Sequence, residues 1–507
     1  MTERSVAAQP STGAIPASTP TTATGAVATA ARNRTALVLL LAATFTVFLN
    51  ETVMSVAIPN IQRDLGISAS TGQWLTTAFA LTMAVVIPIT GWLLQHFTTR
   101  MLFISAMTLF SVGTLIAALA PVFGLLVLGR VVQASGTAIM MPLMMTTMLT
   151  VVPPQDRGRI MGRVAIVMSV APAIGPAISG LLLTVLPWRG LFWVMLPIAV
   201  LMLVVGVARV PNVSELRSVR LDVLSVVLSA SGFSSLVYGL SSLGESAGEE
   251  TAVPPILPIA VGIVILAAFV LRQVSLQKRD AALLDLRTFL SPQFTMSLIM
   301  LAVAMLSLFG TVILIPQFVQ NALGQEPVVV GALLLPGGLL MGVLGPIVGR
   351  LYDRHGPTPL LIPGSIVVSA AFWLMAMTFG PDTQLWNVAA AHIVLSLGLA
   401  FLFTPLFSTG LGSLSPNLYS HGSATVSTLQ QVAAAAGTAL FVALFAIGML
   451  GAGAESVESA SPTEIAAGVH QAFMVGAGIS VVTVVLSFFV RKPAVQPGQD
   501  APAPMGH

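Results

Sequence analysis

The sequence predicts an all-α protein that crosses a membrane many times. Of its 507 residues, 56% are hydrophobic and only 8% are charged, whereas about a quarter are charged in soluble domains. The mean hydropathy is +0.95. Apolar runs of about 20 residues, the length that spans a bilayer as a helix, recur from end to end. A membrane β-barrel would show shorter alternating segments instead, so we expect helices throughout.

Apolar runs bounded by glycine, proline and charge predict fourteen transmembrane helices. The predicted spans are 36–57, 72–94, 101–120, 123–150, 160–186, 190–209, 221–242, 253–272, 293–319, 327–349, 358–379, 386–411, 424–450 and 468–490. Residues 1–34 and 491–507 have no periodic apolar pattern and are predicted to be disordered tails. The first apolar run is too long for a cleavable signal peptide.

The basic residues lie predominantly on one side of the predicted bundle. An even number of spans places both termini on the same side, and of the 21 basic residues only Arg63 and Arg189 fall in loops on the other side. Arg130 falls inside a span, and all the others lie on the side of the termini. Because lysine and arginine are enriched in cytoplasmic loops, we expect both termini in the cytoplasm. The sequence pI of about 9.8 then reflects membrane orientation and not nucleic acid binding.

Two short segments resemble each other and divide the chain into halves. GWLLQHFTTR at 91–100 follows the second span, and GRLYDRHGPTP at 349–359 follows the tenth. With six helices in each half, both segments fall between the second and third helix of their bundle, as an internal repeat requires. We therefore predict six-helix bundles over 35–210 and 289–490, separated by two inserted helices with basic flanking loops over 211–288.

Glu51 stands inside the first predicted span, in the segment FTVFLNETVMSVAIPN at 45–60. A charged side chain at the centre of a bilayer costs at least about 2.5 kcal/mol, and burial favours the neutral acid. We predict that Glu51 carries a transported proton and that Asn50 and Thr52 tune it through hydrogen bonds. The alternatives are a glutamate that merely lines an aqueous vestibule, or one that holds a neighbouring helix by a fixed hydrogen bond.

Arg130 is the one basic residue inside a predicted span. Its guanidinium stays charged and must be paired or hydrated. Gln133 follows three residues later on the same helix face, so the pair can join Glu51 or a substrate in one polar network. In the alternative, Arg130 only extends to the outer membrane surface or caps backbone carbonyls, since it lies near the predicted outer end of its helix.

A transported compound needs a pocket near the membrane midplane. The candidates are adaptable methionines and amides that are costly in hydrocarbon: Met140, Met141, Met144, Met145, Gln133, Gln317, Gln320, Gln430 and Gln431. Ordinary core or lipid-facing methionine is the alternative.

Residues 171–180, APAIGPAISG, combine two prolines with two glycines in the fifth span. Pro172 and Pro176 remove backbone hydrogen bonds, while Gly175 and Gly180 remove side chains. This predicts a kink or a close helix contact that seals the transport path against leak. Packing alone is the alternative.

Several of these segments together resemble the fourteen-helix drug:proton antiporters of the major facilitator superfamily, and specifically their lincomycin-resistance-like multidrug branch. LNETVMSVAIP at 49–59 resembles the first-helix motif of that branch. GRVVQASGTA at 129–138 resembles the fourth-helix motif, and the segment at 171–180 resembles the Gly-Pro motif of antiporters. The likeness covers about residues 36–490. It implies a proton-coupled exporter of hydrophobic or amphipathic compounds, such as lincosamide antibiotics.

The resemblance also implies a cytoplasmic gating motif, and its first copy here departs from the family pattern. That pattern has aspartate at the fifth position and glycine at the eighth, where this chain has Gln95 and Thr98. The residues that match are Gly91 and Arg100 in the first copy, and Gly349, Asp353, Arg354 and Gly356 in the second. A neutral hydrogen bond is about half as strong as a charge-assisted one. We therefore expect a weaker latch at the first copy or a dominant second copy.

The sequence offers no sign of an enzyme. The chain has no cysteine, its six histidines show no metal-ligand spacing, and it has no phosphate-binding loop of the Walker type. We expect no cofactor, no metal and no nucleic acid, and as partners a small-molecule drug, protons and the lipid bilayer, with the chain as a monomer. An exporter of an endogenous metabolite or lipid, or a non-transporting scaffold or sensor, remains the alternative.

Overall fold

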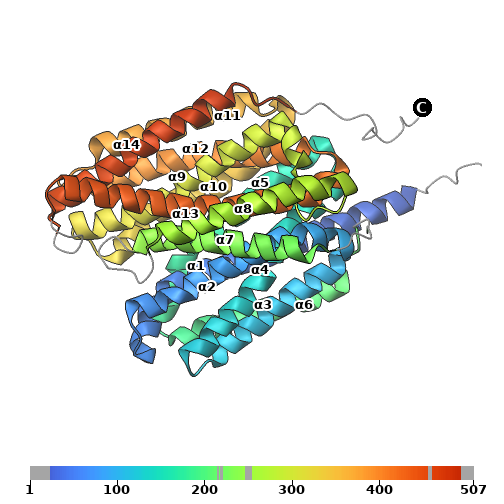
Figure 1. Cartoon of the computed structure of the whole chain (residues 1–507), viewed down its shortest axis with the longest axis horizontal. Coiled ribbons are helices and arrows are strands. Elements are labelled where there is room, and N and C mark those ends of the chain that lie inside the picture. Colours follow the sequence, from blue (N-terminus) through green and yellow to red (C-terminus); the bar gives the residue numbers. More distant parts are fainter. Residues whose placement is uncertain (1–22, 214–215, 217–220, 246–253, 455–459, 493–507) are drawn as a thin grey trace, which may run out of the picture.

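The computed structural model describes residues 23–213, 216, 221–245, 254–454 and 460–492, and these residues form an all-helical fold. Two groups of six long helices flank an inserted pair (Figure 1). The first group is α1 (Ala23–Leu65), α2 (Ala69–His96), α3 (Thr99–Leu119), α4 (Phe123–Val151), α5 (Arg157–Leu183) and α6 (Trp188–Arg209). The inserted pair is α7 (Val223–Glu245) and α8 (Ile256–Leu276). The second group is α9 (Pro292–Gln317), α10 (Pro327–His355), α11 (Thr358–Thr378), α12 (Leu385–Gly412), α13 (Tyr419–Gly451) and α14 (Pro462–Ser487).

Short helices mark several ends of the long ones. They are η1 (Pro154–Asp156), η2 (Gln277–Arg279), η3 (Leu286–Leu290), η4 (Phe318–Ala322) and η5 (Pro416–Leu418). Side-chain caps explain some helix starts: Thr98 accepts a hydrogen bond from the backbone of Met101, and Ser461 forms a capping box with Glu464. Such caps satisfy amide groups that the first helical turn leaves unpaired.

In the part of the chain that the structure describes, thirteen helices are long and apolar enough to cross a membrane. The long helix that is not among them is α5, which carries Arg157, Arg159 and Arg163 in its first two turns and whose side chains at Pro172 and Pro176 lie outside the described residues. The predicted all-α, multi-pass fold is therefore confirmed.

The first helix begins earlier than predicted. α1 starts at Ala23, so the prediction of a disordered tail is wrong for residues 23–34. This segment is rich in alanine, which has the highest helix propensity of all residues, and it continues directly into the first apolar run. Residues 1–22 and 493–507, the rest of the two predicted tails, lie outside the described residues.

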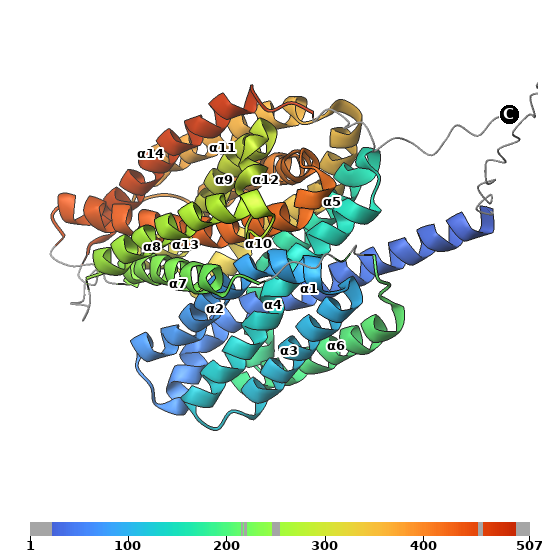
Figure 2. The ribbon, with the colours of Figure 1, turned by 45° about the vertical axis from the view of Figure 1, so that its right-hand side comes forward.

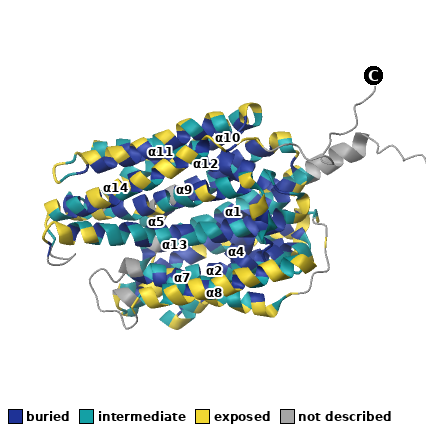
Figure 3. Ribbon diagram, turned by 45° about the horizontal axis from the view of Figure 1, so that its top comes forward, coloured by how far each residue is buried: buried dark blue, intermediate teal, exposed yellow. Residues whose placement is uncertain are grey.

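Large apolar side chains are exposed on outward helix faces, and Figure 3 shows the exposed face of α8. Leu257, Val264 and Leu271 recur every seven residues on this helix, and each is more than half exposed. In water such a stripe would be unfavourable. In a bilayer it faces lipid, which agrees with the predicted span.

The inserted pair lies along the seam between the two groups (Figure 2). α7 packs against α2 of the first group and α13 of the second, while α5 packs against α10. α2 and α13 therefore meet each other and α7. The contact between α5 and α10 is the repeat-equivalent of the contact between α2 and α13.

The two ends of the molecule differ in charge. We call the end where α1 begins and α14 ends the basic end (Figure 1). Its helix ends and loops carry Arg100, Arg159, Arg209, Lys278, Arg350 and Lys492. The opposite end carries Asp64, Glu326 and Asp382.

Candidate functional site

Arg130 lies inside the first bundle, on the second turn of α4, with 2% of its surface exposed. Its Nη1 donates to Oε1 of Gln133 at 2.6 Å, and its Nε donates to the carbonyl of Leu75 on α2 at 3.4 Å. The guanidinium also lies 4.1 Å from the ring centroid of Phe79, a favourable cation–π distance. Arg130 therefore does not extend to the membrane surface, although it does cap one backbone carbonyl.

Gln133 extends this network to a third helix. Its side chain is fully buried, and its Nε2 donates to Oγ1 of Thr114 on α3 at 2.8 Å. Thr114 in turn donates to the carbonyl of Phe110 at 2.7 Å. The predicted pairing of Arg130 with Gln133 is present, and it fixes the guanidinium among α2, α3 and α4.

Glu51 is half-buried on α1 and interacts with Arg130 through charge. The ion pairs within 4.0 Å among the described residues do not include these two side chains. The carboxyl group thus lies within Coulomb range of a guanidinium whose hydrogen bonds go to other partners. Attraction across this gap strengthens when Glu51 is ionised and disappears when it is protonated.

Asn50 and Thr52, the predicted neighbours of Glu51, differ in their hydrogen bonding. Oγ1 of Thr52 donates to the carbonyls of Leu49 at 3.0 Å and of Ala171 on α5 at 3.2 Å, so it joins α1 to α5. Asn50 is 1% exposed, and its Nδ2 has no hydrogen-bond partner. An orphaned buried donor is unfavourable. The predicted tuning of Glu51 by these two residues stays a prediction.

The glycine-proline segment brings one glycine into a very close contact. A Cβ atom at Gly175 would lie 2.1 Å from Oγ1 of Thr52, whereas a Cβ at Gly180 would meet no atom within 4 Å. α5 stays helical through Pro172 and Pro176, whose side chains lie outside the described residues. Gly175 therefore permits the approach of α1 and α5.

The predicted cargo residues do not gather in one place. Met140, Met141, Met144 and Met145 are buried in the hydrophobic core. Gln317 is exposed near the opposite end, where it accepts from Asn321 at 2.7 Å, and Gln320 lies partly buried in η4. Gln430 and Gln431 are partly buried on α13. Their roles in cargo binding stay predictions.

The second gating segment joins α10 to the start of α5 at the basic end. Asp353 accepts hydrogen bonds from the backbone N–H groups of Gly158 and Arg159, both at 2.8 Å. A Cβ at Gly349 would lie 2.1 Å from the carbonyl oxygen of Gly158. Asp353 thus caps a helix of the other bundle, where a carboxylate also meets the positive end of the helix dipole.

Two further residues of this segment end α10. Arg354 is exposed. Gly356 has φ of +77° and donates its backbone N–H to the carbonyl of Tyr352 at 2.8 Å. A positive φ favours glycine, so Gly356 serves to end the helix.

The first gating segment joins α2 to the start of α13 with neutral groups. The amide nitrogen of Gln95 lies 2.7 Å from Nε2 of His421 and donates to Oγ of Ser420 at 3.2 Å. A Cβ at Gly91 would lie 3.4 Å from that of Ala424, an ordinary contact. Arg100 is exposed and donates to the carbonyl of Val207 within its own bundle.

Sequence analysis missed Arg157, which also connects the bundles at the basic end. The residue is 6% exposed, and its Nη2 donates to the carbonyl of Leu149 and to the hydroxyl of Tyr419 on α13, both at 3.0 Å. In the sequence Arg157 resembles the other loop arginines, and only its burial distinguishes it. Together with Asp353 and Gln95 it joins the two bundles at the basic end.

Sequence analysis also missed His392, on the second turn of α12. It is 6% exposed, and its Nδ1 has no hydrogen-bond partner. Within the second bundle, His392 occupies the same turn of the fourth helix as Arg130 does in the first. A comparison of the two repeats would have located it.

Comparison with known proteins agrees with this architecture. The model of the Major Facilitator Superfamily matches residues 40–438. The uncharacterized MFS-type transporter YcnB of Bacillus subtilis is 38% identical over 472 residues, which cover 93% of this chain and 98% of the relative. The lincomycin resistance protein LmrB of Listeria monocytogenes is 40% identical over 448 residues, which cover 87% of this chain and 93% of LmrB. The crystal structure of the human organic anion transporter MFSD10 has a TM-score of 0.64 at 14% identity, with 90% of this chain and 99% of MFSD10 covered. This last likeness concerns the fold alone.

Proposed function

This chain belongs to the major facilitator superfamily, and from that premise we propose that it is a proton-coupled antiporter for drug efflux. It exports hydrophobic or amphipathic compounds, lincosamide antibiotics among them, across the cell membrane. The kinship with a protein named for lincomycin resistance supports the choice of cargo. The basic end then faces the cytoplasm, because cytoplasmic loops are enriched in lysine and arginine.

The observation that supports the proposal is that Glu51 lies within electrostatic range of Arg130 inside the first bundle, without a direct ion pair among the described residues. Arg130 is held by Gln133 and by the carbonyl of Leu75, so its charge stays at a fixed place. Glu51 keeps some exposed surface and forms no ion pair within 4.0 Å with any described residue. A carboxyl group that senses a fixed charge and stays accessible can bind and release a proton at modest energetic cost.

Proton movement is coupled to drug export because Glu51 is accessible from only one side of the membrane at a time. With the basic end closed by α5–α10 and α2–α13, the carboxyl group takes up a proton from outside. When the basic end opens, the proton leaves toward the cytoplasm and the cargo binds. One proton moving inward contributes about 2.3 kcal/mol per 100 mV of membrane potential, which can drive the export of a neutral or cationic compound.

Proton release from reconstituted vesicles tests the proposal. The native chain, Glu51→Gln and the control Glu326→Gln are compared during the addition of lincomycin, a cationic dye and a quinolone. Glu326 undergoes the same chemical change at an exposed position of the opposite end. We expect drug-triggered proton movement in the native chain and the control, and none in Glu51→Gln.

Equal proton movement in Glu51→Gln and the native chain would contradict the role of Glu51. Proton movement with none of the three drugs would contradict drug efflux, and it would redirect the search to endogenous metabolites or lipids.

A further inference from the structure

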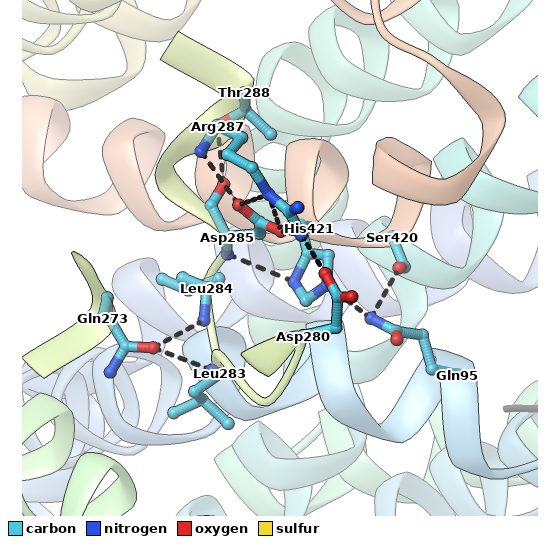
Figure 4. Close-up of polar contacts among 10 residues, drawn as sticks. All are labelled: Gln95, Gln273, Asp280, Leu283, Leu284, Asp285, Arg287, Thr288, Ser420 and His421. Atoms are coloured by element: carbon cyan, nitrogen blue, oxygen red, sulfur yellow. Dashed lines mark hydrogen bonds and ion pairs between the residues drawn. The ribbon is translucent and has the colours of Figure 1, made fainter. Parts of the chain in front are cut away.

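The segment that follows the inserted helices crosses the basic end beside the first gating segment. We call residues 280–291, which lead from α8 to α9, the strap. Figure 4 shows a row of polar contacts that runs from Gln273 on α8, through the strap, to Gln95 on α2. The inserted pair is therefore linked to the α2–α13 contact.

Gln273 anchors the start of the strap. Its side chain is fully buried on α8, and its Oε1 accepts from the backbone N–H groups of Leu283 at 2.7 Å and Leu284 at 3.3 Å. Its Nε2 donates to Oγ of Ser225 on α7 at 2.7 Å. One amide group thus joins both inserted helices to the strap, and each of its polar atoms has a partner.

The inserted helices are themselves joined beside this anchor. Arg272 donates to both carboxylate oxygens of Asp222 at 2.7 Å, and Ser225 also donates to this carboxylate. The guanidinium of Arg272 holds the pKa of Asp222 well below its usual range. A bidentate ion pair of this kind keeps a fixed geometry, so α7 and α8 present Gln273 as a unit.

An internal ion pair shapes the middle of the strap. Arg287 donates through Nε to both oxygens of Asp285, at 3.0 and 2.9 Å, and its Nη2 reaches Asp280. Asp285 is 3% exposed, and Asp280 adopts a left-handed backbone conformation at φ of 50°. The strap is therefore a defined turn with a fixed position for its backbone N–H groups.

One of these N–H groups meets the first gating segment. Asp285 donates its backbone N–H to Nδ1 of His421 at 3.4 Å, and the other ring nitrogen of His421 is the one that contacts Gln95. The carbonyl oxygen of Leu283 also lies 3.2 Å from the position that a Cβ at Gly91 would occupy. The strap thus contacts both sides of the α2–α13 contact.

Apolar packing supports the same arrangement. Leu283 and Leu284 are 2% and 4% exposed, and they form a cluster with Phe269 of α8 and Ala424 of α13, against which Trp92 of α2 packs. Burial of leucine side chains stabilises the contact. The cluster therefore holds the strap against the two gating helices.

We propose that α7, α8 and the strap form a brace that keeps the α2–α13 contact closed, with Gln273 and His421 as positioning residues. The brace stabilises a contact in which Gln95 supplies only a neutral hydrogen bond. The inference rests on the proposed function only in treating the basic end as the side that opens during transport.

Cysteine labelling tests the brace, since the native chain has no cysteine. A single Ala424→Cys substitution places a thiol on α13, facing Gly91. Full-length protein in vesicles is treated with a membrane-impermeant maleimide from the basic side. The test variant is Gln273→Met, which keeps the size of the side chain and removes both polar atoms. The matched control is Gln277→Met, one turn further along, where Oε1 has no partner to lose.

We expect Gln273→Met to raise the labelling rate of the thiol about tenfold, which corresponds to about 1.4 kcal/mol, and Gln277→Met to leave it unchanged. His421→Phe keeps a ring and removes both nitrogen atoms, and it should raise the rate to a similar extent. Only the monodisperse fraction of each purified variant is reconstituted into vesicles, so a misfolded variant does not enter the comparison.

An unchanged labelling rate in either Gln273→Met or His421→Phe would overturn the proposal, as would an equal rise in Gln277→Met. The assay needs neither drug nor proton gradient. If labelling responds as expected while no drug moves protons, the brace stands and the proposed cargo falls.

Discussion

The α5–α10 and α2–α13 contacts occupy equivalent places in the two repeats, yet their chemistry differs. At α5–α10, the carboxylate of Asp353 caps the first turn of α5, and Gly349 lets the two backbones touch. At α2–α13, the amide of Gln95 contacts His421 and Ser420, and the spacing at Gly91 is looser. The first contact joins two helices directly, whereas the second also involves the strap.

The two contacts show that a repeated gate can become asymmetric. A charge-assisted bond to a helix N-terminus is stronger than a neutral one and carries its own orientation. Where aspartate is replaced by glutamine, the same closure requires support from elsewhere in the chain. In this molecule the inserted helices are placed to supply it.

The largest expected effect is the difference in stability loss between alanine substitutions at Gly349 and at Gly91. Gly349→Ala would place a methyl group 2.1 Å from the carbonyl oxygen of Gly158, and neither backbone can move aside without parting the helices. We expect a loss of about 3 kcal/mol in the free energy of unfolding, the upper range for overpacking. Gly91→Ala, whose methyl group would lie 3.2 Å from its nearest neighbour, should lose far less. Thermal unfolding of both purified variants checks this. Equal losses of stability in the two variants would contradict the difference in packing between the α5–α10 and α2–α13 contacts.

The next effect concerns the carboxylate. Asp353→Asn turns one acceptor into a donor that opposes a backbone N–H of α5, so the closed state should lose about 2 kcal/mol. Ser169 lies on α5 opposite Gly342, and labelling of a Ser169→Cys thiol should rise about thirtyfold. Asp156→Asn, an exposed neighbour, is the control. An unchanged rate in Asp353→Asn would show that glycine packing alone closes this contact.

A smaller effect is expected at the neutral latch. Gln95→Leu removes the hydrogen bonds to His421 and Ser420, each worth about 1 kcal/mol or less in net terms, while the brace remains. Labelling of the Ala424→Cys thiol should rise about fivefold, less than the rise at Ser169→Cys in Asp353→Asn. The reverse order of the two rises would mean that α2–α13 is the stronger contact.

The smallest effect on the gates should come from the opposite end, where Asp64 joins α1 to α6 within one bundle. Hydrogen bonds from Trp188 and Arg189 lower the pKa of Asp64. Its folded pKa lies below its unfolded value, so its stabilising contribution is present above about pH 4 and fades as the pH falls. Asp64→Asn should lower the unfolding temperature at neutral pH, and this deficit should shrink in acid. Labelling at the basic end should not change, and a change there would tie the two ends together.

Much of the fold and part of the site could be predicted from the sequence. Glu51 and Arg130 are conspicuous because charge is rare in an apolar span. The three-residue step from Arg130 to Gln133 places these two side chains on the same face of α4. The helix over residues 23–34 was missed because low hydropathy there concealed a strong alanine propensity.

The contacts between bundles could not be predicted in the same way. Gln95 and His421 are far apart in the chain, and nothing local to either residue indicates the other. Arg157 was counted with the loop arginines, because its burial depends on Tyr419 from the other bundle. The strap carries ordinary loop residues, whose role arises only where α7 and α8 place it.

A reversible disulfide between α2 and α13 tests most directly whether the basic end opens between these two helices. In a Gly91→Cys, Ala424→Cys double variant the two Cβ atoms would lie about 3.4 Å apart, close to disulfide geometry. Oxidation should cross-link α2 to α13 and stop lincomycin export, and a reductant should restore it. Export that continues at the native rate in fully cross-linked protein would contradict the claim that the basic end opens between these helices.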